Sequence, residues 1–482
     1  MLFNSVDFLI FLPIVFLVYW FVVPKDLQKQ NFLLLIASYF FYACWDLRFL
    51  PLLMASTLLD FYTGAKIHQT DSLRTRKLWL MISIGINLSI LGVFKYYNFF
   101  AESLMTLLSN FGLNAQPSLI QVILPVGISF YTFHGLSYVI DLYNQKIKPE
   151  RNFISYAVFV CFFPLLVAGP IERASHLLPQ ITRKRSFDYQ KASEGMRQIL
   201  WGLFKKIVIA DNCAIYVNTI FDHHQDYSGS TLLLGSLFFS FQIYGDFSGY
   251  SDIALGTARL FGIELLQNFS FPFFSRDIAE FWRRWHISLS SWFRDYLYIP
   301  LGGSRKGQKI AVRNIFIIFI VSGFWHGANW TFVFWGALHA LYFLLLVLSN
   351  QNKKNVDILA QGKQFPTLKD FFSMLLTFVM VTFAFIFFRS ENLTQAFAFI
   401  SGILSPDLFS LPYFLGIKQA FITSILILFM LFMEWFSRAQ QFGIQSIATH
   451  WKRPYRWLFY YCITLLIFLF GTQSQEFIYF QF

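Results

Sequence analysis

The sequence has 482 residues and a formal net charge of +12, with 56% hydrophobic, 21% aromatic and only 13% charged residues. A soluble globular protein carries about 25% charged residues, so this composition excludes an ordinary soluble protein and predicts a surface that faces lipid. The basic residues lie in short clusters between apolar runs, not in one stripe interleaved with aromatic residues. This pattern is typical of membrane proteins and argues against a nucleic-acid partner.

The apolar runs are continuous and do not alternate with polar residues, which predicts membrane helices and not barrel strands. About 18 apolar residues cross most of the hydrocarbon layer. We therefore expect an all-α polytopic membrane protein with about 11 transmembrane spans, forming one domain over residues 1–482. Candidate runs lie near residues 6–23, 31–46, 49–65, 78–95, 119–140, 194–220, 230–247, 311–348, 370–388, 395–413, 418–436 and 454–472.

The basic loops predict the orientation of these spans. The loop after the third run carries Lys66, Arg74, Arg76 and Lys77, which places it in the cytoplasm. Each span changes the side of the membrane, so the three spans before this loop put the N-terminus on the extracytoplasmic side. Residues 349–369 are expected to form a polar loop, and residues 370–482 the C-terminal helices.

One apolar segment does not fit this alternation. Residues 153–168 are flanked by basic residues on both sides, so a full crossing would place one flank on the wrong side. We expect a re-entrant or broken helix that ends at Gly169-Pro170. Such helices are tolerated at membrane depth only against protein or a water-filled cavity, so this segment is a candidate wall of a functional cavity.

A second unusual segment, residues 271–313, is too polar to face lipid and unusually rich in aromatic residues. Amphipathic interfacial helices are expected here, leading to Pro300 and the turn at Gly302-Gly303. The apolar stripe of these helices follows helical spacing at Trp282, Trp285, Leu289 and Trp292.

Ionisable residues inside membrane runs are costly and are therefore candidates for function. His326 lies between two long apolar runs, and its neighbours Gly323, Gly327 and Ala328 are small enough to let a substrate approach the backbone. A neutral imidazole can take a proton from a hydroxyl near pH 7. Asn329 could orient that ring or polarise a carbonyl. A histidine that joins two helices by a hydrogen bond explains the local pattern equally well.

Other polar candidates have simpler structural interpretations. His286 lies among aromatic residues and can be read as an interfacial anchor, and His134 as a hydrogen-bonded histidine between helices. Asp246 and Asp252 end another apolar run and are expected to cap a helix or to pair with an arginine such as Arg259. The histidines and cysteines show no metal-ligand spacing, so no metal site is expected.

Several segments together resemble the membrane-bound O-acyltransferase (MBOAT) family, in the AlgI-like group of alginate O-acetylation proteins. They occur in order within residues 1–348: Met1–Ser5, Leu124–Phe133, Phe163–Ile171, Tyr244–Asp252, Phe281–Tyr296 and Gly323–Gly327. The resemblance implies a helical bundle around a central tunnel. It also implies that His326 is the catalytic base and His286 a second catalytic residue, and that Asn329, Asp246, Trp325 and Pro170 lie close to them.

The same resemblance implies transfer of an acyl group, in the simplest case acetyl, from a cytoplasmic thioester such as acetyl-CoA to an extracytoplasmic hydroxyl. The acceptor would be a polysaccharide handled by a partner protein outside the bacterial inner membrane, with no permanently bound cofactor. Arg283, Arg284 and Arg305 are candidates for binding donor phosphates. Two alternatives stay open: D-alanyl transfer to a cell-wall polymer from a carrier-protein thioester, and a lipid or solute transporter, although no half-repeats are evident.

Overall fold

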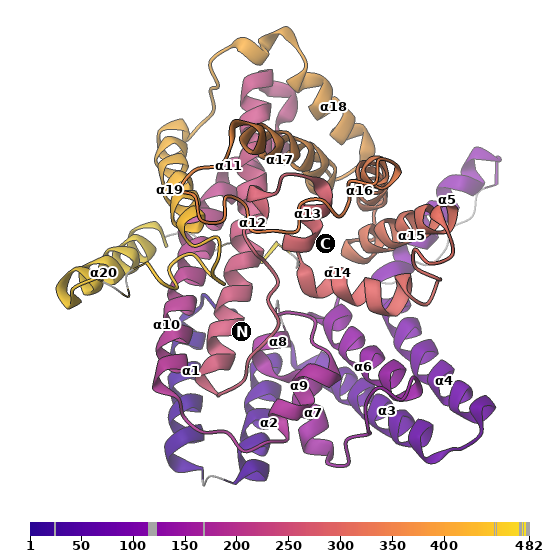
Figure 1. Ribbon diagram of the computed structural model, residues 1–482. Helices are drawn as coiled ribbons and strands as arrows, with labels where there is room; N and C mark the ends of the chain where they lie inside the picture. The colour runs from indigo at the N-terminus through magenta and orange to yellow at the C-terminus, as the bar shows by residue number, and fades with distance from the viewer. Residues whose placement is uncertain are drawn as a thin grey trace. The chain divides into compact units, whose positions relative to one another are not determined.

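The computed structural model describes residues 1–23, 26–113, 123–166, 169–447, 449, 451–471, 475 and 477–478 (Figure 1). Every regular element in these residues is helical, which confirms the predicted all-α class. The chain divides into two compact units. The first comprises Met1–Ala192 with Ala258–Leu266, and the second comprises Ser193–Thr257 with Gln267–Phe482.

Hydrogen bonds to one buried carboxylate hold the helices of the first unit together. Helices α3, α4 and α6 lie side by side (Figure 1). The Asp60 carboxylate of α3 accepts hydrogen bonds from Ser83 and Asn87 of α4, at 2.6 and 2.8 Å. Gly135 of α6 lies so close to Asp60 that a Cβ there would be 1.9 Å from the carboxylate oxygen. The helices of this unit are α1 (Val6–Leu17), α2 (Leu27–Ala43), α3 (Leu50–Gln69), α4 (Leu73–Leu91), α5 (Tyr97–Asn110), α6 (Ile128–Tyr143), α7 (Phe153–Cys161), α8 (Phe163–Leu166) and α9 (Ala174–Ile181).

The segment predicted as a broken helix over residues 153–168 is interrupted at Phe162 in the first unit, whereas residues 167–168 lie outside the residues that the structure describes. Helix α7 stops at Cys161 and the four-residue α8 follows, because Phe162 has extended backbone geometry with ψ 117°. The freed amide of Phe163 donates to the Ser38 hydroxyl at 3.0 Å. The buried His134 ring stabilises the break, since it lies 3.3 Å from the Val160 carbonyl and accepts from the Glu172 amide at 3.1 Å. His134 is thus a hydrogen-bonded structural histidine, as predicted.

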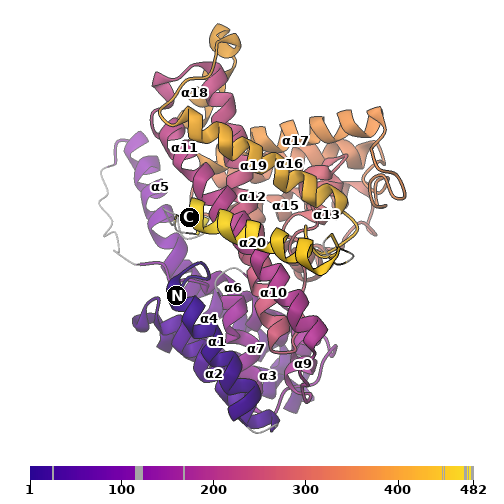
Figure 2. The same ribbon diagram turned by 90° about the vertical axis from the view of Figure 1, so that its left-hand side faces the viewer.

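The second unit contains the remaining helices. A π-helical segment, Phe204–Ala210, joins α10 to α11, and α20 lies across it (Figure 2). The helices are α10 (Tyr189–Leu203), α11 (Asp211–Asp222), α12 (Gly229–Leu260), α13 (Ile278–Arg284), α14 (Ile287–Phe293), α15 (Gln308–His326), α16 (Trp330–Leu348), α17 (Leu368–Arg389), α18 (Leu393–Ile403), α19 (Ile417–Phe436) and α20 (Arg453–Phe470). The first residues of α10 and the last of α12 belong to the first unit.

Five of the described helices are long and apolar enough to cross a membrane, consistent with a multi-pass membrane protein: Leu73–Asn110, α15, α16, α17 and α19. The other predicted spans stay predictions. The run 311–348 forms α15 and α16 on either side of residues 327–329, as the position of His326 between two apolar runs predicts. The run 395–413 is not one long helix, because α18 ends at Ile403 and a short 3-10 helix, Pro406–Phe409, follows.

Buried ion pairs join the π-helical segment Phe204–Ala210 to α12 in the second unit. The Lys205 ammonium lies 2.7 Å from the Asp252 carboxylate, and the Lys206 ammonium lies 2.7 Å from both Asp246 and Asp211. Asp246 also accepts from the Ile478 amide at 2.6 Å, which holds Ile478 in the core. The expected pairing of Asp252 with Arg259 is therefore wrong. Arg259 pairs with the nearby Glu264 at 3.0 Å instead, and a close helix crossing supplies Lys205 as the partner of Asp252.

Candidate active site

His326 is the last residue of α15, where a tight turn leads into α16. The two helices pack so closely that a Cβ at Gly323 would lie 2.2 Å from the Phe332 carbonyl oxygen, and one at Gly336 would lie 2.3 Å from the Phe319 carbonyl oxygen. A Cβ at Gly327 would be 2.1 Å from the Phe332 ring. The glycines beside His326 therefore serve helix packing, and they fix the imidazole at the end of a close helical hairpin.

His286 lies at a break between two short helices. Its backbone is left-handed, with φ 43°, a conformation that is rare for residues other than glycine and that clusters at functional sites. The stripe from Trp282 to Trp292 is interrupted at this break, because the chain ends α13 at Arg284 and starts α14 at Ile287. Trp285, Leu289 and Trp292 are buried within the protein, and the predicted interfacial location of these helices stays a prediction.

The structure brings the two predicted catalytic histidines together in the second unit. Their ring centroids are 6.2 Å apart, and their exposed fractions are 0% for His286 and 3% for His326. Burial lowers the pKa of the His286 imidazole, which favours its neutral form. The surrounding rings are aromatic, with Phe247 at 4.7 Å from His286, and Trp335 and Phe388 at 5.2 and 5.4 Å from His326.

A chain of hydrogen bonds holds the segment that carries His286. The Asn268 carbonyl accepts from the Ile287 amide at 2.9 Å, and its side chain accepts from the Ser288 hydroxyl at 2.6 Å. The Asn268 amide group in turn donates to Ser251 of α12 at 3.1 Å. This second layer of contacts stabilises the strained turn at His286 and thereby its ring position.

The other predicted site residues take different positions. The Trp325 ring lies 4.9 Å from His326 and 5.9 Å from His286, as expected for a wall of the site. Asp246 is bound to Lys206 and does not contact either histidine ring. Asn329 caps α16, since its side chain accepts from the Thr331 amide at 3.0 Å and donates to the Glu391 carbonyl at 2.7 Å. Pro170 belongs to the first unit, so its proximity to His326 stays a prediction.

A pocket of about 600 Å³, here called the Trp282 pocket, runs along α15 toward His326. Its inner end reaches Ser322, which precedes His326 by one helical turn on the same face. The pocket has apolar walls and a polar mouth. The walls include Trp282, Phe293, Ile315, Ile318, Phe319 and Phe343, and the mouth includes Arg294, Ser304, Gln308, Asn352 and Lys353.

A second pocket, the Asn329 pocket, lies immediately beyond His326 in the chain. It has a volume of about 620 Å³ and is lined by the turn Gly327–Asn329 and by the ends of α11 and α17. Its polar groups include Arg389, whose guanidinium donates to Asn218 at 2.9 Å and lies 3.3 Å from the Asp222 carboxylate. This mixture of donors and acceptors suits a ligand rich in hydroxyl groups.

A third pocket, the Arg438 pocket, has a volume of about 560 Å³ and is lined by Arg283, Arg284 and Arg438. The three residues predicted to bind donor phosphates therefore lie at two different pockets. Arg283 and Arg284 line this pocket, whereas Arg305 is an exposed residue beside Ser304 at the mouth of the Trp282 pocket.

Two groups of residues beside the site were missed from the sequence. The Trp282 indole donates to His339 at 3.3 Å, and the Trp335 ring lies between His339 and His326, at 4.9 and 5.2 Å. The signal was available, because Trp335 and His339 are four residues apart on one helix face. The adjacent Lys205-Lys206 in an apolar run was a second signal, since buried lysines require partners.

Comparison with known proteins places the chain among acyltransferases. Residues 147–356 match the profile of MBOAT, the membrane-bound O-acyltransferase family. The chain is 40% identical to "Probable alginate O-acetylase AlgI" of Pseudomonas putida over 400 residues, which is 82% of this chain and 79% of that protein. It is 38% identical to a peptidoglycan O-acetyltransferase of Helicobacter pylori, over 84% of this chain and 80% of that protein. A teichoic acid D-alanyltransferase of Bacillus subtilis is 28% identical, over 55% of this chain and 69% of that protein.

Proposed function

The chain belongs to the membrane-bound O-acyltransferase family and is an O-acyltransferase, and we propose that it moves an acetyl group from a cytoplasmic thioester to a polysaccharide hydroxyl outside the membrane. The acetyl group is favoured over D-alanine because the relatives named as O-acetylases are 38–40% identical, against 28% for the D-alanyltransferase. The bacterial inner membrane is the corresponding location, with a partner protein presenting the polysaccharide.

The observation that carries this proposal is the place of His326 in the helical hairpin, between Ser322, which lines the Trp282 pocket, and Gly327, which lines the Asn329 pocket. The Trp282 pocket follows α15 up to Ser322, and the Asn329 pocket begins at Gly327. Each has a volume typical of a small-molecule site. An acyltransferase needs this arrangement, because two substrates must meet head to head at one base.

The charges of the two pockets assign the substrates. Arg294 and Lys353 at the mouth of the Trp282 pocket attract an anionic donor, and its apolar walls accept an uncharged thioester arm. The basic residues Arg305, Lys306, Lys309 and Arg313 predict that this mouth faces the cytoplasm. The hydroxyl acceptor then enters through the Asn329 pocket on the opposite side.

The proposed reaction is direct transfer. A nitrogen of the neutral His326 imidazole takes the proton of the acceptor hydroxyl, and the hydroxyl oxygen attacks the thioester carbonyl carbon. The carbon–sulfur bond breaks as the carbon–oxygen bond forms, and the imidazolium returns its proton to the thiolate. The products are an ester and a free thiol, with no net uptake or release of protons. The buried aromatic surroundings exclude water, which would otherwise hydrolyse the thioester.

Replacement of His326 tests the assignment. His326→Gln should lower the rate of labelled acetyl transfer from acetyl-CoA in isolated membranes by about 10²- to 10⁴-fold, the contribution of a general base. His68→Gln is the matched control, because His68 is exposed at the end of α3. A near-normal rate in His326→Gln would contradict the proposed base.

The choice of donor and of reaction class is tested with the unaltered chain. Acetyl-CoA and a D-alanyl carrier protein are supplied in parallel, and labelled product is isolated from the acceptor. If only the D-alanyl carrier protein gives labelled product, the activity is D-alanylation and not acetylation. Movement of cargo without covalent change would point to a transporter.

A further inference from the structure

Helix α13 and the segment 350–363, here called the strap, form a wall shared by two pockets. Trp282 of α13 lines the Trp282 pocket, whereas the next two residues, Arg283 and Arg284, line the Arg438 pocket. The strap divides in the same way. Asn350, Asn352 and Lys353 line the Trp282 pocket, and Asn355, Val356, Asp357 and Ile358 line the Arg438 pocket.

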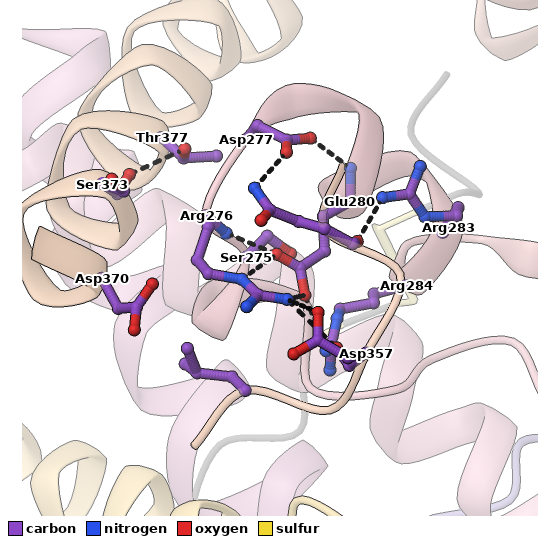
Figure 3. Close-up of polar contacts among 12 residues, drawn as sticks. Ser275, Arg276, Asp277, Glu280, Arg283, Arg284, Asp357, Asp370, Ser373 and Thr377 are labelled. Atoms are coloured by element: carbon purple, nitrogen blue, oxygen red, sulfur yellow. Dashed lines mark hydrogen bonds and ion pairs between the residues drawn. The ribbon is translucent and has the colours of Figure 1, made fainter. Parts of the chain in front are cut away.

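The four arginines near this wall are Arg276, Arg283, Arg284 and Arg438. Carboxylates neutralise the charges of two of them, Arg276 and Arg284 (Figure 3). Glu280 accepts from Arg276 at 3.0 Å and from Arg284 at 2.8 Å, and Asp357 lies 3.0 Å from Arg276. Asp277 caps α13 and holds the strap through the Asn355 side chain at 2.6 Å. These contacts anchor the strap to α13 and leave the charges of Arg276 and Arg284 largely neutralised.

Arg283 and Arg438 differ, because they donate hydrogen bonds only to main-chain carbonyl groups, and the Arg438 guanidinium also lies over the Trp435 ring, 4.6 Å from its centroid. Arg283 donates to the carbonyls of Asn352 and Asn355. Arg438 donates to four carbonyls, those of Leu359, Ala360, Lys363 and Trp435. In the described part of the chain, neither guanidinium forms an ion pair with a carboxylate, so two positive charges that line one pocket lack counter-charges.

These guanidinium groups also retain hydrogen-bond donors. Each has five N–H groups, so the two bonds of Arg283 leave three free and the four bonds of Arg438 leave one free. Most of the other lining residues are polar and include Gln267, Gln440, Gln441 and Gln445, beside the apolar Val356, Ile358 and Ala439. A polar pocket with unbalanced arginine forks fits phosphate oxygens better than an acyl chain.

We propose that the Arg438 pocket is a binding site for a phosphorylated nucleotide, separate from the Trp282 pocket that takes the acyl arm. Phosphate groups lie against Arg283 and Arg438 and neutralise their charges. Because both arginines hold the strap, the bound nucleotide fixes the strap as the wall of the Trp282 pocket. The binding site stands on its own contacts, whereas its effect on acyl transfer rests on the proposed function.

ADP binding to the full chain in detergent tests the site. The unaltered chain should bind ADP saturably, and Arg283→Gln should raise the Kd by roughly tenfold or more, as expected for the loss of a charge-assisted contact. Lys354→Gln is the matched control, because it removes the same charge from an exposed strap residue that lines neither pocket. The proposal is overturned if the unaltered chain does not bind ADP, if Arg283→Gln binds as well as it does, or if Lys354→Gln loses as much affinity.

Protection of the strap gives a second readout that does not depend on a variant. Lys353 and Lys354 are exposed, so trypsin should cut the strap. ADP should slow this cleavage in the unaltered chain while leaving cleavage at Lys184 unchanged. Equal cleavage with and without ADP would overturn the link between the nucleotide and the strap.

Competition with acetyl-CoA identifies the source of the nucleotide. Displacement of ADP by acetyl-CoA would show that the pocket holds the nucleotide end of the donor itself, and simultaneous binding would show a separate nucleotide. Both results support the site. Failure of the proposed function is recognised independently, because a chain that binds ADP without transferring acetyl groups would refute the function and leave the site intact.

Discussion

The close packing of α15 on α16 predicts that a single methyl group at Gly323, a residue that lines neither pocket, disrupts catalysis. In Gly323→Ala the new Cβ would lie 2.2 Å from the Phe332 carbonyl oxygen. An ordinary van der Waals contact is about 3.4 Å or more, so the two helices must separate by about 1 Å. A displacement of that size at a reacting group lowers the rate by about 10²-fold. Overpacking also destabilises the fold by about 1–3 kcal/mol.

The assay for Gly323→Ala compares acetyl transfer in membranes at equal amounts of folded protein, with thermal unfolding in detergent as the stability measurement. The matched control is Gly85→Ala in α4, where a new Cβ would meet no atom within 4 Å. Replacing a helical glycine by alanine at such an open position should be neutral or stabilising by up to about 1 kcal/mol. If Gly323→Ala transfers acetyl groups as fast as Gly85→Ala, the helical hairpin does not position His326 as argued.

Two further predictions concern other positions. At His286, two variants should distinguish backbone strain from catalysis. His286→Asn should unfold at a higher temperature than His286→Ala, because asparagine tolerates the left-handed backbone better than alanine does. Both variants should lose most acetyl transfer, because both lack the imidazole. Equal unfolding temperatures of the two variants would contradict the claim that the backbone at His286 is strained. In the first unit, a hydrogen bond of 2.8 Å to Glu172 raises the pKa of the half-buried His176. A raised pKa stabilises the folded state fully below the ordinary histidine pKa of about 6.5, and this stability is lost as the pH rises through the folded-state value. His176→Gln should therefore flatten the dependence of thermal stability on pH above about 6.5, and an unchanged profile would contradict it.

The helical class and much of the helix order could be predicted from the sequence, because long apolar runs have few other solutions in lipid. The break in the apolar segment 153–168 was also predictable, since basic residues flank it on both sides. The joint location of His286 and His326 followed from the family resemblance. Their local patterns alone were compatible with ordinary packing.

The backbone break at His286 could not be predicted from the sequence. Trp282, Trp285 and Leu289 keep helical spacing across it, and periodicity does not reveal a single left-handed residue. The pairing of Lys205 with Asp252 and of Lys206 with Asp246 was equally inaccessible, because these carboxylates come from a helix about 40 residues away. Arg259 was a reasonable local choice for Asp252, but glycines at positions 202, 249 and 256 let α10 and α12 approach closely enough to bring the lysines nearer.

The buried lysine pair also has a consequence for biogenesis. Lys205 and Lys206 leave the ribosome before Asp246 and Asp252, so Asp211 is the first of their carboxylate partners to be synthesised. A lysine without a partner at the centre of an isolated membrane helix costs about 2.5–3.5 kcal/mol on insertion. We therefore expect the segment from α10 to α11 to stay outside the hydrocarbon layer until α12 is synthesised, so that the ion pairs that stabilise the finished protein also influence the order of its assembly.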